Sequence, residues 1–386
     1  MYSHDRCRQV CEELLEPTGI TINGSKEYDI KVHNPNVFKK ILSKGSLGFG
    51  ESYMDGEWDC DSLDELFARI LSNDVRTKLK KLKPSHLLTA ILSRGMSVVT
   101  NPQSVSKSRQ VGEQHYDLGS VYKSMLDKRM VYSCGYWKSD EFDLNKAQES
   151  KLELTCEKVR LKPGMKVLDI GCGWGSFLKY AAEKYGIEGV GVSISKNQVE
   201  FGNQSCHGLP IKIKLQDYRY LNGEEEFDAI VSLGMFEHVG PKNYKTFMKV
   251  VDRNLKHGGL FLLHTIGSNN TKSLGMDPWI NKYIFPGGKL PSQAQIASSA
   301  EGIFVNEDWH SLTDESGSYY DKTLMAWHNN FKNSWSELQE QYGERFKRMW
   351  DYYLLSCAGS FRSRNTQTWQ AVFSRKGEVS GYKSIR

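Results

Sequence analysis

The segment Val167-Leu168-Asp169-Ile170-Gly171-Cys172-Gly173-Trp174-Gly175 decides the fold. Its apolar beginning predicts a short buried strand over 166–170, and the periodicity that follows predicts a helix over 175–185. Glycines at every second position of the connecting turn let the backbone approach a ligand closely. The N–H groups at the start of the helix then point at that ligand. The segment therefore predicts a binding site at the end of a strand.

Strands and helices alternate outward from this segment, which favours a parallel, doubly wound α/β sheet. A helix begins near residue 145, ahead of the glycine-rich segment. Aromatic-rich sequence with further helices follows the last predicted strand. The other predicted strands cover 188–193, 211–215, 227–232 and 259–265, and the other predicted helices cover 196–205, 241–255, 322–338 and 342–355.

The first hundred residues read as a smaller, mainly helical domain. Asn34-Pro35-Asn36 is typical of a helix start and Gly45 of a helix end, while the glycine- and aromatic-rich segment 48–58 favours a loop or bend. A chain of 386 residues is long enough for two domains. We place an N-terminal domain at 1–105, a polar linker near residue 108 and a catalytic domain at 109–386.

Composition narrows the function only a little. The net charge of +5 suits an anionic partner without identifying one. The basic run 76–83 is either a solvated face or a contact with an anionic membrane, and aromatic residues of the N-terminal domain, such as Phe49 and Trp58, are either core or apolar surface. The start of the chain lacks an apolar leader, so a cytoplasmic location is expected. Eight scattered cysteines without a CxxC pair predict reduced thiols and no metal site.

The short GxGxG form of the glycine-rich turn resembles the motif with which class I methyltransferases bind S-adenosylmethionine. The resemblance implies that Asp169 supports the amino-acid end of this cofactor. The second strand ends without the usual acid for the ribose, so Ser193 and Gln198 are the expected ribose contacts. The predicted cofactor-binding residues are Tyr132, Ser133, Asp169, Gly171, Cys172, Gly173, Gly175, Ser193, Gln198, Gln216, Asp217 and Tyr218.

The sequence after the fourth strand, Ser232-Leu233-Gly234-Met235-Phe236-Glu237-His238-Val239-Gly240, is where a methyl acceptor lies in this fold. It lacks the N/D-P-P-Y/F/W signature of methyltransferases that act on nucleic-acid amino groups. No base-stacking module is evident elsewhere, so nucleic acid is not an expected partner.

Three segments resemble the cyclopropane fatty acid and mycolic acid synthase family: 115–119 (HYDLG), 132–137 (YSCGYW) and 263–267 (LHTIG), together with 232–240. The resemblance extends over most of the chain. It implies transfer of a methylene group from S-adenosylmethionine to a cis double bond in a phospholipid acyl chain. A bound bicarbonate ion then serves as the base that allows the ring to close. The residues carried over to this chemistry are Cys134, Glu237, His264, Ile266 and Tyr320, with the adjacent Tyr319 as the open alternative to Tyr320.

The resemblance also implies a homodimer associated peripherally with the inner face of the cell membrane. From the residues alone, other interpretations remain open. Cys134 is equally a small buried apolar residue, His264 a satisfied core histidine, and Glu237-His238 a helix-start pair. Two other functions also remain: methyl transfer without ring closure, and a lipid-binding module that has lost catalysis.

Overall fold

The computed structural model describes residues 4–73, 75, 119–271 and 276–386. The basic run 76–83, the predicted linker near residue 108 and the segment 115–118 lie outside the described residues. Contacts between residues divide the chain into two compact units, each built from segments that are distant in sequence. The first unit consists of Met1–Asn101, Leu274–Pro286 and Tyr320–Thr366, and the second of Pro102–Ser273, Gly287–Tyr319 and Gln367–Arg386.

The second unit is built on a seven-stranded sheet with the order β5-β4-β3-β6-β7-β11-β8. The strands β5, β4, β3, β6 and β7 pair in parallel, while β8 and β11 pair antiparallel at the other side. The predicted doubly wound α/β class is confirmed. The strands are β3 (Lys166–Ile170), β4 (Glu188–Ser193), β5 (Ile211–Leu215), β6 (Phe227–Leu233), β7 (Leu255–Ser268), β8 (Val305–Ser311) and β11 (Thr366–Ser374).

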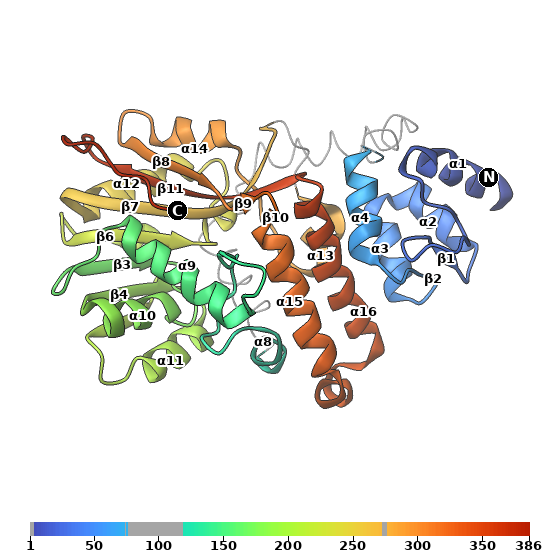
Figure 1. The fold of residues 1–386 in the computed structure, drawn as a ribbon, viewed down its shortest axis with the longest axis horizontal. Helices are drawn as coiled ribbons and strands as arrows, with labels where there is room; N and C mark the ends of the chain where they lie inside the picture. The colour runs from blue at the N-terminus through green and yellow to red at the C-terminus, as the bar shows by residue number, and fades with distance from the viewer. Residues whose placement is uncertain (1–3, 74, 76–118, 272–275) are drawn as a thin grey trace. The chain divides into compact units, whose positions relative to one another are not determined.

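Helices cover both faces of this sheet (Figure 1). Successive side chains of a strand point to opposite faces, so the strands contribute to two separate cores. Val167 belongs to the core that includes Leu178, and the next residue, Leu168, belongs to the core that includes Phe247. The helices of the second unit are α8 (Gly119–Met125), α9 (Leu144–Lys158), α10 (Ser176–Tyr185), α11 (Lys196–Ser205), α12 (Tyr244–Asn254) and α14 (Gln293–Ala300).

The order of the strands reverses between β3 and β6, and this places the site. Ligands of doubly wound sheets bind beyond the carboxyl ends of the strands at such a reversal. Gly171 and Gly234 lie there, directly after β3 and β6, and both have positive φ angles, 84° and 74°. A Cβ atom on Gly171 would come within 2.6 Å of Met235, so the two loops approach each other as closely as glycine allows.

The first unit is mainly helical, with one short pair of antiparallel strands. The predicted helix start after Pro35 and end at Gly45 are confirmed. The helix predicted around 322–338 is wrong in running across Ser334, where α15 and α16 separate, while Gly343, with a φ of 72°, interrupts α16 beside the predicted helix start at 342. The elements are α1 (His4–Leu15), α2 (Asn36–Lys44), α3 (Ser46–Met54), α4 (Leu63–Ser72), α13 (Pro278–Tyr283), α15 (Tyr319–Asn333) and α16 (Trp335–Arg362), with β1 (Lys31–Val32) and β2 (Trp58–Asp59).

The loop predicted over 48–58 is wrong, because α3 occupies most of it. Its glycines serve close packing rather than a bend. A Cβ atom on Gly48 would lie 2.2 Å from the carbonyl oxygen of Lys40 in α2, and one on Gly50 would lie 2.4 Å from the Trp279 ring in α13. Close contact with neighbouring helices has therefore overridden the weak helix propensity of glycine.

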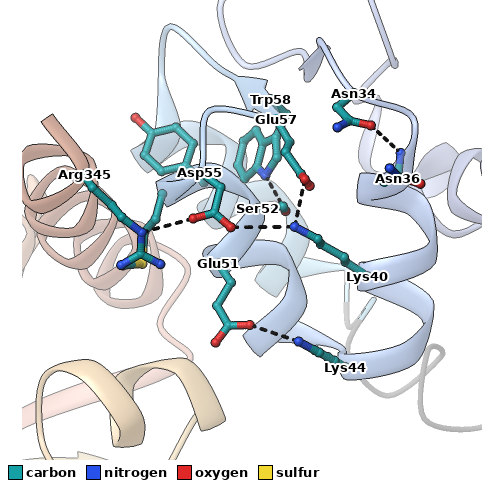
Figure 2. Close-up of polar contacts among 12 residues, drawn as sticks. Asn34, Asn36, Lys40, Lys44, Glu51, Ser52, Asp55, Glu57, Trp58 and Arg345 are labelled. Carbon is teal, nitrogen blue, oxygen red and sulfur yellow. Dashed lines mark hydrogen bonds and ion pairs between the residues drawn. The ribbon is translucent and has the colours of Figure 1, made fainter.

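Aromatic and charged side chains tie α3 to α16 inside the first unit. Phe49 stacks on Trp58 with ring centroids 4.2 Å apart, and Tyr352 of α16 packs against Phe49 at 6.4 Å. These aromatic side chains therefore form a core. Figure 2 shows Asp55 between Arg345, at 3.1 Å, and Lys40, at 3.7 Å.

Gly48→Ala tests the close packing of α2 against α3. The added methyl group meets backbone rather than a movable side chain, so we expect a loss of about 2 kcal/mol of unfolding free energy in a denaturant titration. Ser43→Ala, at an exposed position of α2, is the control and should change stability by less than about 0.5 kcal/mol. Equal stability of the two variants would contradict the packing account.

Candidate active site

The segment 132–137 is held in place by two buried side chains of α9. Gln148 Nε2 donates to the carbonyl oxygen of Ser133 at 2.8 Å, and Lys151 Nζ donates to the Ser133 hydroxyl at 3.1 Å. Gln148 and Lys151 lie one helical turn apart and are 0% and 1% exposed. Cys134 is fully buried, and its thiol donates to the carbonyl oxygen of Gly135 at 3.2 Å. Tyr132 packs edge-on against Tyr122, with ring centroids 5.0 Å apart.

Asp169 and Lys151 are two buried titratable groups whose charges influence each other. Burial raises the pKa of Asp169 to about 7, against the opposing effect of the Lys151 charge. Burial lowers the pKa of Lys151 to about 8, and Asp127 and Asp169 oppose that shift. Asp169 Oδ1 is buried, and no described residue donates a hydrogen bond to it. A buried acceptor in this state is costly unless a ligand supplies the donor.

The turn after β3 forms a cradle of backbone. Gly173 and Gly175 both have left-handed φ angles, 54° and 82°, and Gly175 begins α10. A Cβ atom on Gly173 would meet nothing within 4 Å, whereas one on Gly175 would meet Ile213 at 2.5 Å. Cys172, directly before Gly173, is buried, and burial holds its thiol pKa well above the ordinary value. The glycines and the unpartnered Asp169 oxygen fit the zwitterionic amino-acid end of S-adenosylmethionine.

The predicted ribose and adenine contacts also lie together. Ser193 Oγ donates to Gln198 Oε1 at 2.9 Å. The backbone N–H of Gln216 donates to the carbonyl oxygen of Ser193, also at 2.9 Å. Asp217 forms a 2.6 Å ion pair with Arg219, and the buried Tyr218 lies between these two residues in sequence. The ends of β4 and β5 thus bring these predicted residues to one edge of the sheet.

Glu237 lies in a short 3-10 turn after β6 and reaches across to β7. Its Oε1 accepts a 2.6 Å hydrogen bond from the backbone N–H of Ile266. Its Oε2 is buried and receives no hydrogen bond from the part of the chain that the structure describes. Burial raises the pKa of Glu237 to about 7, although the Ile266 N–H opposes the shift. This carboxylate is bound to the strand that carries His264.

The parallel register of β6 and β7 pairs His264 with Leu233, four residues before Glu237. Its Nδ1 lies 3.4 Å from Gln370 Nε2 in β11. Its Nε2 is buried, and none of the described residues bonds to it. Burial, followed by the charges of Lys151 and Lys158, holds the pKa of His264 well below the ordinary value, so the ring is neutral. His264 is therefore not a satisfied core histidine.

Tyr320 belongs to the first unit, and its place in the site stays a prediction. Its ring stacks on Phe361 at 4.5 Å and meets Trp327 edge-on at 5.9 Å. The preceding residue, Tyr319, belongs to the second unit. It donates to Asp314 at 2.9 Å and packs edge-on against Tyr136 at 5.4 Å.

Sequence analysis missed Gln148, Lys151 and Gln370. Their polar character gave no signal, because exposed polar residues are ordinary in a helix or an edge strand. A signal for α9 was present in the spacing, since polar residues at 148, 151, 155 and 158 share one helix face. The predicted alternation of strands and helices does not determine whether this polar face of α9 points to solvent or packs against the sheet.

The described residues contain no group of three or more His, Cys, Asp or Glu side chains arranged to hold a metal ion. All eight cysteines are free thiols. Among helices of the described ranges, none is both long and apolar enough to cross a membrane.

Comparison with known proteins decides the family. The family model described as mycolic acid cyclopropane synthetase matches residues 103–371. The chain belongs to this family. It is 53% identical over 383 residues to the cyclopropane-fatty-acyl-phospholipid synthase of Escherichia coli strain K12, with 99% of this chain and 97% of that protein covered. The predicted family and enzyme class, an S-adenosylmethionine-dependent C-methyltransferase, are confirmed.

Solved structures show the same fold. The cyclopropane synthase MmaA2 from Mycobacterium tuberculosis is 29% identical, with a TM-score of 0.64 and coverage of 69% of this chain and 98% of that one. The mycolic acid cyclopropane synthase CmaA1, in a complex with S-adenosylhomocysteine (SAH) and CTAB, is 31% identical with the same TM-score and coverage. The predicted class I methyltransferase fold is confirmed.

Glu237→Gln tests the burial of the Glu237 carboxyl. Folding raises the pKa of the Glu237 carboxyl from about 4.5 in the unfolded chain to about 7. The stabilisation that this carboxyl contributes is therefore complete at a pH below 4.5 and is lost as the pH rises through about 7. Glutamine cannot ionise, so the variant should exceed the wild type in unfolding free energy by up to about 3 kcal/mol at pH 8, and match it at about pH 4.

Chemical denaturation at the two pH values measures this difference. Glu200→Gln, at an exposed position of α11, is the matched control and should show the same difference from wild type at both pH values. A Glu237→Gln variant whose stability follows the wild type at every pH would contradict the burial of an ionisable Glu237.

Lys151→Met tests whether α9 supports the cofactor site. Ser133 loses a hydrogen bond and Asp169 loses a nearby positive charge, so affinity for SAH in calorimetry should fall about tenfold. Lys158→Met is the matched control, since it removes a buried lysine from the same face and leaves Asp308 paired with Arg386 at 2.7 Å. Equal losses of affinity in the two variants would show a general effect on α9.

Proposed function

We propose that this chain transfers a methylene group from S-adenosylmethionine to the cis double bond of unsaturated phospholipid acyl chains, forming a cyclopropane ring with bound bicarbonate as the base. The observation that carries the proposal is the presence of two buried, unpartnered atoms, Glu237 Oε2 in the turn after β6 and His264 Nε2 in the adjacent strand β7. The 53% identical relative is a cyclopropane-fatty-acyl-phospholipid synthase, which supports the same substrate class here.

The two atoms differ in what they offer a ligand. The Gln370 amide N–H points at His264 Nδ1, so the proton of this neutral ring lies on Nε2, which is a donor. Above a pH of about 7 the Glu237 carboxyl is ionised and is an acceptor, held in position by the Ile266 N–H. A ligand that fits both must accept one hydrogen bond and donate another. Bicarbonate has this combination, with two anionic oxygens and one hydroxyl group.

Positive charge around His264 also favours an anion. Lys151 and Lys158 are both buried in α9, and their charges contribute to the lowered pKa of His264. An anion next to the ring would interact favourably with the same charges. Bicarbonate, when bound, supplies a base able to remove a proton from the added methyl group. The protein groups hold that base and keep water away, because His264 and Glu237 are both buried.

The cofactor residues act at the other side of β3. The glycine-rich turn supplies backbone N–H groups, Asp169 supplies an acceptor for the ammonium group, and Ser193 with Gln198 supplies hydrogen bonds for the ribose. Cys134 lies in the segment held by Gln148 and Lys151, and the proposal assigns it to the lining of the site. Tyr320 completes the proposed donor set for bicarbonate.

The remaining proposals concern the membrane. We assign lipid recruitment to residues 1–105, peripheral association with the inner face of the cell membrane to the basic run 76–83, and a homodimer to the assembled enzyme. Each basic residue near an anionic bilayer contributes about 1 kcal/mol of attraction. The relative's phospholipid substrate supports these assignments, since an enzyme that acts on bilayer lipids must approach the bilayer.

Labelled cofactor tests the reaction. The full chain is incubated with S-adenosylmethionine labelled in its methyl group and with vesicles of unsaturated phospholipid. We expect labelled acyl chains that gain CH₂ and lose the double bond. Label in chains that keep the double bond would show methyl transfer without ring closure, and vesicles without label would show a module that has lost catalysis. Either result would contradict the proposal.

A further inference from the structure

A chain of buried hydrogen bonds runs from α9 to the His264 ring. The hydroxyl of Thr155 donates to the carbonyl oxygen of Lys151 at 2.8 Å, as expected one turn along a helix. With its proton used there, Thr155 Oγ1 accepts from Gln370 Nε2 at 3.5 Å. The same Nε2 donates toward His264 Nδ1 at 3.4 Å. Thr155, Gln370 and His264 are all at most 1% exposed.

Each donor in this chain fixes the direction of the next. The two N–H bonds of the Gln370 amide face two acceptors, Thr155 Oγ1 and His264 Nδ1. An amide turned the other way would present its oxygen to Thr155, whose proton is already used, whereas in the observed orientation Gln370 Oε1 is buried and accepts no hydrogen bond from the described residues. A histidine that accepts at Nδ1 carries its ring proton on Nε2.

We propose that Gln370 and Thr155 are positioning residues that hold His264 in the tautomer with the proton on Nε2. This assignment rests on the proposed function, because a donor at Nε2 is what an anionic base in the site accepts. The buried Nε2 has no partner among the described residues, so its proton is available to a ligand. Gln370 and Thr155 act through His264 and do not themselves contact the base.

His310 is a second histidine next to Gln370, and its ring nitrogen Nδ1 also faces a donor. Gln370 lies opposite His310 in the register of β11 and β8, and His310 Nδ1 lies 2.9 Å from the buried Lys158 Nζ. Burial lowers the pKa of Lys158 to about 7, and in its charged form below that pH lysine can only donate, so His310 then also accepts at Nδ1. Burial, reinforced by Lys158, lowers the pKa of His310 to about 3, so this ring is neutral as well. His310 therefore makes no competing demand on the Gln370 amide.

Nitrogen NMR of the full chain labelled with ¹⁵N in its histidine rings tests the proposal. The His264 signals are assigned by their loss in His264→Gln. We expect the Nε2–H tautomer in the wild type and in Thr155→Ser, which keeps the hydroxyl. Gln370→Glu places an acceptor against Nδ1 and should move the proton there, while Thr155→Val should give a mixture of tautomers.

Thr368→Val is the matched control. Thr368 lies two residues from Gln370 on the same strand, and its buried hydroxyl has no partner in the described part of the chain. Removing it should leave the His264 signals unchanged. An Nδ1–H tautomer in the wild type would overturn the proposal, as would unchanged His264 signals in both Thr155→Val and Gln370→Glu.

Kinetics supply the second measurement. In Gln370→Glu we expect the KM for bicarbonate to rise about tenfold and the KM for S-adenosylmethionine to stay within about twofold of wild type. Equal increases in both KM values would show a structural role and overturn the proposal. Should wild-type turnover prove independent of bicarbonate, the proposed function fails, and the NMR result still decides the tautomer.

Discussion

The face of α9 that packs on the sheet is polar, and the site depends on this contact. An amphipathic helix normally buries its apolar side, but α9 buries Gln148, Lys151, Thr155 and Lys158. Buried polar groups are tolerated when they are hydrogen-bonded. Here their partners are Ser133, Gln370 and His310, which lie in segments far apart in sequence. One helix thus positions the cofactor segment and the proposed base-binding histidine together.

The strand alternation explains why these partners meet. Val167, Val231 and Leu262 belong to the core on the α9 side of the sheet. Residues two positions further along β3 and β7, Asp169 and His264, point the same way. They lie at the carboxyl ends of the strands, where the apolar core stops and polar groups begin.

The sequence predicted the central part of this arrangement well. Strong apolar runs and the glycine-rich turn predicted β3, β4, β5, α10 and α11 with their observed bounds to within a residue. The α3 helix was missed because close packing, which allows no side chain at Gly48, is a tertiary effect. The first unit gathers α13, α15 and α16 from late in the chain, and no local pattern announces such long-range contacts. The polar partners of Ser133 and His264 were missed for the same reason.

The central claim is that Glu237 and His264 hold bicarbonate in a site separate from the cofactor. Titration of the full chain with ¹³C-labelled bicarbonate, in the presence of SAH and followed by carbon NMR, tests it most directly. The account predicts saturable binding that is lost in His264→Ala and strongly weakened in Glu237→Gln, while both variants still bind SAH. Bicarbonate binding that is absent from the wild type, or unchanged in both variants, would contradict it.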